Sequence, residues 1–389
     1  MSFKMRLSPV DHIFTGRGGY PINFLLFFPG KIDPVRTRAS LERAVELFTP
    51  FRSRLVASLD QGKTFEFQES SQGLGWNVQK STALPAREDL HALTDMMKSA
   101  QGIPGESLLE VTLTHHAEGS ALGVSGSHCV VDGYSYFMFL VAWSKLFRNE
   151  TPVSPELDRN LLLSNAPLQD GIFDRARVFR DTGFAFCERL RPGDSSRVTW
   201  EVLDFSKAEL ESLYQVATSK TGVRLSLNDV LSAEIWRRFT RMHQKSGQRL
   251  SLACAFDYRR AHGNLSPFYF GNAVRGASFE ADYAEVLESE PYELALRVNR
   301  AVQAIDARSV QDSLECLESL RRQEGLGAME RFQVADPDTG FLVTNLSRLP
   351  LLDLDFGTGT PTDFRILTPA RHTAVVLPLR DGLRVQIAL

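Results

Sequence analysis

The sequence predicts a mixed α+β fold made of two halves of similar size. At 389 residues the chain exceeds the length at which one hydrophobic core usually stops growing, which predicts two domains. Short apolar runs typical of strands alternate with longer segments in which apolar residues recur at helical spacing. A stretch rich in helix-breaking prolines, residues 150–197, lies between the halves and suits a long crossover between domains.

The first elements of the chain are a predicted strand and a predicted helix. Residues 22–28 are an apolar run that suits a buried strand and is too short to span a bilayer. Residues 38–51 predict a helix, because apolar side chains recur there at helical spacing: Leu41, Ala44, Val45 and Phe48.

A hairpin and a buried helix follow. Residues 107–128 predict two strands that turn around Glu118 and Gly119. Residues 133–147 are rich in aromatic side chains and long enough for a buried helix, with Asp132 at the position of its N-cap.

The second half repeats the alternation of helices and strands. We expect two helices, a strand, two further helices and a terminal hairpin, in this order: residues 206–221, 226–245, 250–259, two helices within 281–322, and 373–389. The terminal hairpin is indicated by Arg380-Asp381-Gly382 between two apolar runs.

Composition argues against several classes of protein. The formal net charge of -3 leaves no broad basic field for nucleic acid or an anionic membrane, so neither is expected as a partner. The N-terminal residues lack the apolar core and cleavage site of a signal peptide. The four cysteines show neither metal-binding spacing nor the density of a disulfide scaffold. We therefore expect reduced thiols, a cytoplasmic protein and no bound metal.

The segment Ser-His-Cys-Val-Val-Asp-Gly, which contains His128 and Asp132, is the strongest candidate site. Its spacing alone is weak, because His91 and Asp95 repeat it within a predicted surface helix. His128 differs in ending an apolar strand just before Gly133 at a strand-to-helix turn. A neutral imidazole there can act as a general base, and the alternative is a satisfied interior histidine beside a helix cap.

Two neighbouring patterns favour unreactive interpretations. Cys129 is better explained as a small core residue than as a nucleophile. The Asp-Phe-Gly triplet at 355–357 also occurs in protein kinases, but the chain has no Gly-rich loop and no His-Arg-Asp segment upstream. A kinase is therefore excluded.

Together, "SHCVVDG" and "DFGTGTP" resemble the His-x-x-x-Asp-Gly and Asp-Phe-Gly-Trp-Gly motifs of BAHD acyltransferases, which move an acyl group from coenzyme A to an alcohol or amine. Further segments resemble the family in the same order: "LSPVDHIF", "LERAVELFTPFRSRL", "SLNDVLSAEIWRR", "FDYRRAHGNLSPFYFGNAV" and "VTNLSRLPLLDLDFG". The resemblance covers most of the chain. It is weakest in the crossover and in residues 280–330.

The resemblance implies two domains of the chloramphenicol acetyltransferase type, each a mixed sheet with flanking helices, and an active-site channel between them. We expect an N-terminal domain at 1–165, a crossover linker at 166–197 and a C-terminal domain at 198–389. The donor and the acceptor would enter the channel from opposite faces and meet at His128. Acyl-coenzyme A is then a co-substrate, and the resemblance implies a monomer with no permanently bound cofactor and no metal.

The resemblance also implies roles for individual residues. His128 would be the general base, Asp132 would point away from the substrate and pair with Arg259, and the Thr344 hydroxyl would support an oxyanion. The remaining matched positions would have structural roles: Gly133, Asp355 and Gly357.

Two departures from the family pattern concern the acceptor more than the reaction. Thr358 replaces the usual Trp of the second motif, and Leu346 replaces a Trp that often forms a wall of the acceptor pocket. Two other functions stay open. One is a carrier-protein-dependent condensation or ester-forming enzyme of the same superfamily, although Ser127 stands where condensation domains usually have a second His. The other is a non-catalytic binding protein that retains the fold.

Overall fold

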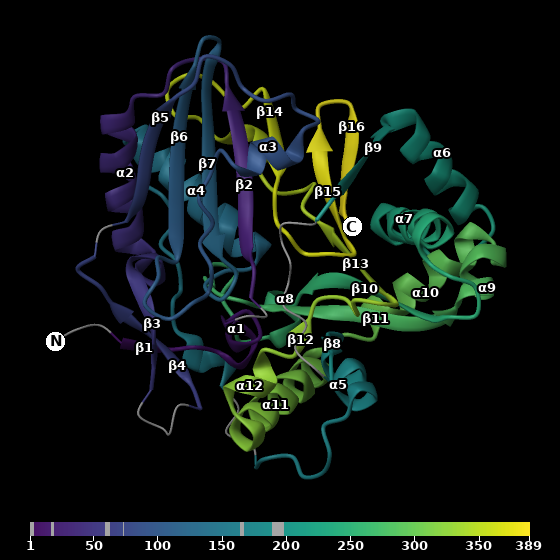
Figure 1. The fold of residues 1–389 in the computed structure, drawn as a ribbon. Helices are drawn as coiled ribbons and strands as arrows, with labels where there is room; N and C mark the ends of the chain where they lie inside the picture. Colours follow the sequence, from purple (N-terminus) through teal and green to yellow (C-terminus); the bar gives the residue numbers. More distant parts are fainter. Residues whose placement is uncertain (1–3, 17–18, 59–62, 73, 164–166, 189–197) are drawn as a thin grey trace.

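The computed structural model describes residues 4–16, 19–58, 63–72, 74–163, 167–188 and 198–389. Two large sheets lie beside each other, one of five strands and one of six. Helices cover their outer sides, and a smaller helical layer lies below both sheets in the view of Figure 1.

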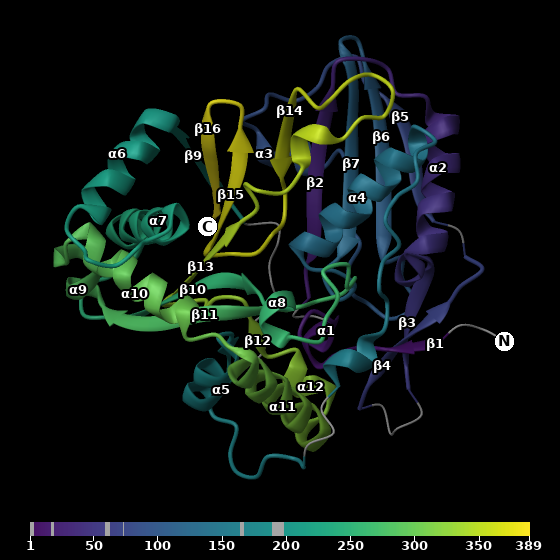
Figure 2. The same cartoon turned by 180° about the vertical axis from the view of Figure 1, so that it is seen from behind.

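The first sheet has the strand order β14-β2-β7-β6-β5, in which only β5 and β6 are parallel neighbours. The strands have these bounds: β2, Pro21–Phe28; β5, Gly75–Lys80; β6, Leu109–His116; β7, Gly119–Ser127; β14, Asp363–Ile366. Helices α2 (Pro34–Leu47) and α4 (Gly133–Phe147) pack against each other, and Figure 2 shows α4 in front of the strands. The Trp143 indole donates a hydrogen bond to Ser40 Oγ at 3.0 Å and so joins the two helices.

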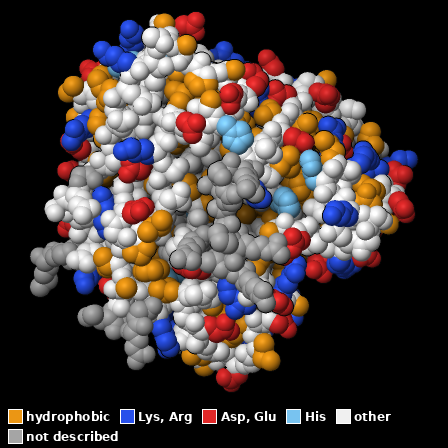
Figure 3. Space-filling view, in the orientation of Figure 1, with side chains coloured by type: hydrophobic (Ala, Val, Ile, Leu, Met, Phe, Trp, Pro, Cys, Tyr) orange, Lys and Arg blue, Asp and Glu red, His pale blue; other side chains and the backbone are white. Residues whose placement is uncertain are grey.

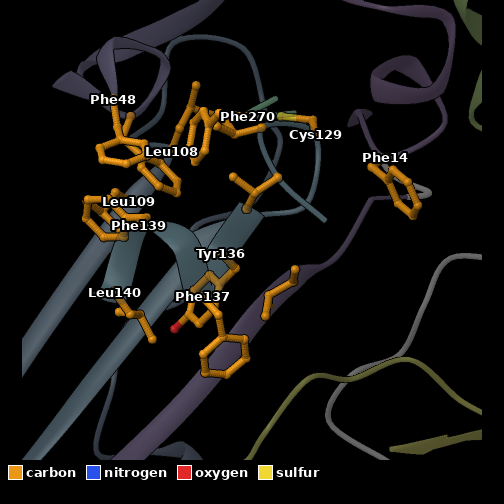
Figure 4. Close-up of a cluster of buried hydrophobic side chains, with 14 of the residues drawn as sticks. Phe14, Phe48, Leu108, Leu109, Cys129, Tyr136, Phe137, Phe139, Leu140 and Phe270 are labelled. Atoms are coloured by element: carbon orange, nitrogen blue, oxygen red, sulfur yellow. The ribbon is translucent and has the colours of Figure 1, made fainter. Parts of the chain in front are cut away.

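Helix α4 is apolar on most of its surface because it is buried within a continuous apolar core. Its aromatic rings meet rings from other elements: Phe139 lies edge-on to Phe48 and Phe51, at centroid distances of 5.5 and 4.7 Å. Figure 4 shows this cluster, in which Phe270 from the second half also takes part. A helix that is buried on most sides needs no polar face, so its sequence is nearly all apolar.

The second sheet has the order β11-β10-β13-β15-β16-β9, with parallel pairs at β10–β13 and β13–β15. The strands have these bounds: β9, Trp200–Ser206; β10, Arg249–Asp257; β11, Val274–Asp282; β13, Gly340–Asn345; β15, Thr373–Leu379; β16, Gly382–Ala388. The helices beside it, at the right of Figure 1, are α6, Lys207–Thr218; α7, Leu227–His243; α9, Tyr283–Glu288; and α10, Pro291–Gln303. Capping boxes begin α6 and α7, where Ser206 pairs with Glu209 and Ser226 with Asp229.

The remaining described elements are short or lie below the sheets. Their bounds are: β1, Lys4–Arg6; α1, Pro9–His12; β3, Ser53–Ala57; β4, Phe65–Glu69; α3, Leu90–Thr94; α5, Arg175–Thr182; β8, Ala185–Phe186; α8, Arg259–His262; α11, Ala307–Glu324; α12, Leu326–Met329; β12, Phe332–Gln333. Strands β1, β4 and β3 form a small sheet, and β12 pairs with β8.

Most of the elements expected from the sequence are present. The hairpin of β6 and β7 closes with His116 opposite Gly119, and β15 and β16 form the terminal hairpin. Two expectations were incomplete. The region expected to hold two helices holds α9, α10 and α11, because α9 is too short to show helical periodicity. The crossover contains α5, and its residues 166 and 189–197 lie outside the described residues.

The second His-x-x-x-Asp spacing, His91 to Asp95, spans the end of a short helix in the structure. Helix α3 ends at Thr94, and Asp95 is its C-cap. The backbone N–H of Asp95 donates to the carbonyls of His91 and Leu93, and its side chain is exposed. The ring of His91 lies edge-on to Trp200, with 5.1 Å between centroids.

The domain limits 1–165, 166–197 and 198–389 stay a prediction. One strand crosses them, because β14 comes from the C-terminal part of the chain and pairs with β2 of the first sheet, Phe364 opposite Leu26. The C-terminal part of the chain therefore completes the N-terminal sheet, which ties the two halves together.

The face of the molecule drawn in Figure 3 carries no single-sign field among its described residues. Lys and Arg are interspersed with Asp and Glu over this face. Within the described ranges, every helix is too short or too polar to cross a membrane, and no cluster of His, Cys, Asp and Glu has the geometry to hold a metal ion.

Candidate active site

His128 lies directly after β7, at the point where the two sheets meet. Its main-chain N–H donates to the carbonyl of Tyr20 at 3.3 Å, and its half-buried side chain lines a cavity formed by both halves. Lining side chains include Phe14, Tyr20 and Ile22 from the first half and Thr344, Leu346 and Val375 from the second. The cavity is narrow, about 100 Å³, so it has room for the reacting end of a substrate only.

The environment of His128 keeps its imidazole neutral. The ring stacks on Phe14 at a centroid distance of 3.8 Å and lies edge-on to Tyr20 at 5.1 Å. Burial among these rings lowers the pKa of His128 from 6.5 to about 4. Its own backbone carbonyl, Asp132 and Asn272 all raise the pKa, but burial outweighs them. At neutral pH the imidazole is therefore unprotonated and able to accept a proton.

Asp132 and Arg259 form the predicted buried ion pair. Arg259 Nη2 lies 2.9 Å from Asp132 Oδ2, and both side chains are almost wholly buried. Asp132 is also the N-cap of α4, because its Oδ1 accepts from Ser135 N at 2.8 Å. Burial lowers the pKa of Arg259, but the attraction of Asp132 and Asp257 outweighs burial. The pKa of Arg259 is therefore raised above its usual value. The prediction that Asp132 pairs with Arg259 is confirmed, and the N-cap role accompanies that pairing.

A second buried ion pair approaches His128 from the other side. Asp11 Oδ2 lies 2.9 Å from Arg159 Nε, and the two side chains are 0% and 1% exposed. Asp11 Oδ1 accepts from the side-chain amide of Asn272 at 2.8 Å, and the same amide donates to the main-chain oxygen of His128 at 2.8 Å. Arg159 Nη2 donates to the carbonyl of Val130 at 2.9 Å, so both ends of this network hold the loop that carries His128.

Asp11 and Arg159 were not predicted from the sequence as residues of the site. Asp11 is part of a local signal, a capping box in which Ser8 and Asp11 begin α1, but that signal predicts a helix start and not a site. Arg159 lies in the proline-rich stretch 150–197 without a motif of its own.

Thr344 and Leu346 come from the end of β13 and the residue that follows it. Both side chains line the cavity of His128, so the structure brings Thr344 and His128 into one site, as expected. Leu346 occupies space close to the backbone of Gly133, where an added Cβ would approach Leu346 Cδ2 to 3.0 Å. Gly133 therefore allows the first turn of α4 to approach the second half.

The Asp-Phe-Gly element lies at the other end of α4. Asp355 Oδ1 accepts from the backbone N–H groups of Gly357 and Gly359 at 2.7 and 3.1 Å, and Gly357 has a φ of 82° that favours glycine. The Ser144 hydroxyl donates to the carbonyl of Asp355 at 3.0 Å. Since α4 spans roughly 20 Å at 1.5 Å per residue, this element supports the helix far from His128.

Cys129 is unsuited to act as a nucleophile. Its side chain is fully buried, its Sγ lies 3.1 Å from Ser127 Oγ, and burial raises the pKa of the thiol to about 12. Figure 4 includes it in the cluster of buried hydrophobic side chains.

A second and larger cavity lies on the outer side of the second half. Its volume is about 900 Å³, and α6, α10 and the start of α7 line it. It contains three cationic side chains, Lys207, Arg224 and Arg348, and two acidic ones, Glu211 and Asp229. Arg348 lies only two residues after Leu346, so one loop contributes to both cavities.

Known proteins share the fold, and relatives of 26 to 28% identity match most of the chain. TRI101 of F. sporotrichioides, solved in complex with coenzyme A and T-2, superimposes with a TM-score of 0.78 over 100% of this chain and 95% of that one, at 17% identity. A hydroxycinnamoyltransferase of Narcissus pseudonarcissus is 26% identical over 88% of this chain and 79% of its own. A hydroxycinnamoyl-CoA:5-hydroxyanthranilate N-hydroxycinnamoyltransferase of Avena sativa is 28% identical over 97% and 88%.

The fold defines a two-domain protein of the chloramphenicol acetyltransferase type with a cavity between its halves. The model of the family described as the Transferase family matches residues 81–389. The chain belongs to this family, the BAHD acyltransferases, and is an acyl-CoA-dependent acyltransferase.

Proposed function

We propose that the chain transfers an acyl group directly from acyl-coenzyme A to a hydroxyl or amine acceptor, with His128 as the general base and without a covalent acyl-enzyme. The observation that carries this proposal is a neutral imidazole lining the cavity between the two halves, with a pKa lowered to about 4. The imidazole accepts the proton of the acceptor while the acceptor attacks the thioester. Both substrates therefore have to be bound together beside His128.

The reaction proceeds by proton transfer and addition. His128 removes the proton of the acceptor as its oxygen or nitrogen attacks the thioester carbonyl, and the carbonyl oxygen becomes an oxyanion. The Thr344 hydroxyl, which lines the same cavity, donates a hydrogen bond to that oxyanion. When the carbon–sulfur bond breaks, the imidazolium returns the proton to the leaving sulfur and the base is regenerated.

Two ion pairs keep the base in place. The Asp132–Arg259 pair fixes the start of α4 against the loop before β11, and the Asp11–Arg159 pair fixes the loop at Val130. The imidazole therefore needs no carboxylate in contact with its own ring to be oriented.

The larger cavity is the proposed site for the nucleotide part of the donor. The cavity of His128 is too narrow for a whole acyl-coenzyme A, whereas about 900 Å³ is available beside α6, α7 and α10. Lys207, Arg224 and Arg348 supply positive charge for phosphates there, and Arg348 belongs to the loop that follows Thr344. The donor would bind with its phosphates in this cavity and its thioester beside His128.

The acceptor group is an oxygen or a nitrogen. Relatives named for hydroxycinnamoyl transfer to both kinds of acceptor support this range, and the apolar lining of the site suits an aromatic or fatty acyl chain. We also propose that the enzyme is a cytoplasmic monomer without a permanent cofactor. The buried, protonated thiols of Cys129, Cys254 and Cys316 support a reducing compartment.

Mass spectrometry of products tests the function. The protein is incubated with acetyl-, butyryl- and hydroxycinnamoyl-coenzyme A and a mixed panel of alcohols and amines, and thiol release is measured in parallel. We expect acylated product from the wild type and a loss of about 10²- to 10⁴-fold in His128→Ala, as for removal of a general base. His91→Ala is the matched control and should retain its rate. Turnover of His128→Ala near the wild-type level would overturn the mechanism.

A further inference from the structure

Arg275 is a buried cation in the wall of the catalytic cavity that the proposed mechanism does not use. It lies in β11, the edge strand of the second sheet, which runs beside the α5 and α11 layer in Figure 1. Its side chain is 7% exposed, and it lines the same cavity as His128 and Thr344.

The hydrogen bonds of Arg275 leave most of its guanidinium unused. Nη1 donates to the main-chain oxygen of Ser309 at 2.7 Å, which holds the group against the first turn of α11. Nε is buried and has no hydrogen-bond partner among the residues that the structure describes. A guanidinium has five N–H donors, so a single carbonyl satisfies only a small part of its capacity.

Arg275 also differs from four other buried arginines, each of which has a carboxylate partner. The ion pairs are Arg159 with Asp11, Arg259 with Asp132, Arg321 with Glu318, and Arg365 with Asp363. Within the described ranges, no acidic side chain forms an ion pair with Arg275. Asp181, Asp306 and Asp312 attract it from a distance, but burial outweighs them and lowers the pKa of Arg275.

An arginine in this state is unfavourable for the empty protein. Removing a charge from water costs several kcal/mol unless a partner of opposite charge replaces the water. Most of the other lining residues are apolar, and the carboxylate among them, Asp132, is already bound to Arg259. An anion brought by a substrate would supply the missing partner.

We propose that Arg275 binds a carboxylate of one of the two substrates, which makes this enzyme selective for an acidic acyl group or an acidic acceptor. The proposal rests on the proposed function, because the carboxylate has to enter the cavity of His128 with the reacting group. Arginine suits this task because its planar fork forms two parallel hydrogen bonds with a carboxylate.

The two possible sources of the carboxylate are separated with matched substrates. The donor arm compares succinyl-coenzyme A with butyryl-coenzyme A, which have the same acyl chain length, on a neutral acceptor from the panel. The acceptor arm compares 3-hydroxybenzoate with 3-hydroxybenzamide under one neutral donor. In one arm we expect the wild type to prefer the acid in kcat/KM. In Arg275→Gln this preference should fall about 10- to 100-fold, as for loss of a hydrogen bond to a charged group.

Arg308→Gln is the matched control. Arg308 is an exposed arginine beside Ser309 that pairs with Asp312, so its loss removes a positive charge near α11 without touching the cavity. Its acid preference should equal that of the wild type. If neither arm shows a preference for the acid in the wild type, or if Arg275→Gln keeps the preference, the proposal is overturned even when the acyltransferase activity is confirmed.

Two further measurements decide the matter if no substrate is turned over, which would count against the proposed function alone. Calorimetry with benzoate and benzamide should show tighter binding of benzoate to the wild type, and Arg275→Gln should remove the difference. Equal affinities in the wild type would overturn the proposal. Thermal melts of Arg275→Met should show a higher midpoint than the wild type, because an uncompensated charge is removed. A lower midpoint would mean that the bond to Ser309 is structural and would count against the proposal.

Discussion

The side-chain amide of Asn272 lies 2.8 Å from the main-chain oxygen of His128 and 2.8 Å from Asp11 Oδ1. One buried amide thus connects the catalytic loop to a carboxylate that is itself paired with Arg159. Because the amide reaches the backbone of His128 and also raises the pKa of its ring, it controls both the position and the basicity of the imidazole.

Asn272→Ala tests this connection. We expect the variant to fold with a loss of stability of about 1–3 kcal/mol, because the buried oxygens of Asp11 and His128 lose a donor. The value of kcat should fall about 10- to 100-fold, as for a small misplacement of a catalytic group, with little change in KM. The acid limb of the pH–rate profile should move to lower pH, because Asn272 raises the pKa of His128. A purely structural amide would leave that limb unmoved.

The Asp132–Arg259 ion pair predicts a non-additive double mutant. Arg259→Gln strands the carboxylate of Asp132 in the interior and should cost about 3–5 kcal/mol of stability. Asp132→Asn should also be destabilising, and the double mutant should cost less than the sum, with a coupling of ~0.5–3 kcal/mol. Denaturant melts of the four proteins measure it. Strict additivity would mean that Asp132 acts only as the cap of α4.

Thr344→Val separates oxyanion stabilisation from substrate binding. Valine has nearly the shape of threonine, so the cavity is retained and only the hydroxyl donor is lost. The value of kcat should decrease about 10- to 100-fold, somewhat less than for removal of a fixed backbone or amide donor, while KM changes little. Steady-state kinetics over a range of both substrates distinguish a lower kcat from a higher KM. A higher KM with an unchanged kcat would mean that Thr344 binds substrate and does not stabilise the oxyanion.

The pKa of His128 predicts the pH dependence of the reaction. With a pKa of about 4, the base is unprotonated throughout the neutral range. With a hydroxyl acceptor, which does not titrate in this range, the value of kcat/KM should therefore stay level from pH 8 to about 5 and fall below it, which buffered initial rates would show. A break near 6.5 would instead indicate a solvated imidazole.

The same shift affects stability. Because the folded-state pKa is below the unfolded value of 6.5, the unfolded chain binds the proton first, so stability is lost as pH falls from 6.5 towards 4. His12 has a pKa lowered to about 3 by burial and acts in the same direction. The informative comparison is thus His128→Gln, whose stability should depend less steeply on pH than that of the wild type.

The basic side chains of the larger cavity predict the salt dependence of donor binding. Arg224→Gln should raise KM for the acyl-coenzyme A about 10-fold, as for one lost contact to a phosphate, and leave kcat unchanged. The wild-type KM should rise with ionic strength, and the variant should respond less. Arg241→Gln, an exposed site on α7 outside the cavity, serves as the control. Equal KM values for Arg224→Gln and wild type would place the phosphates elsewhere.

The sequence by itself determined the parts of the site that depend on neighbours in the chain. His128, Asp132 and Gly133 are recognisable because a strand, a cap and a helix start follow one another within a few residues. The hairpin before them was predicted from two strand-like runs around a turn, and the helix after them from its aromatic content, its length and its cap, which are also local properties. The match of Arg259 came from family resemblance, since it lies 127 positions from Asp132 and no local rule connects them.

Only the tertiary structure decided which other residues act on the site. Asp11 and Arg159 are 148 positions apart, and nothing in either segment indicates that they meet under the loop of His128. Strand β14 gives no sign in the sequence of joining the first sheet. In the sequence, Arg275 is one charged residue among many, without a motif of its own. Its significance arises because the fold buries it beside His128 without an acidic partner, and burial and counter-charge are set by side chains that arrive from distant parts of the chain.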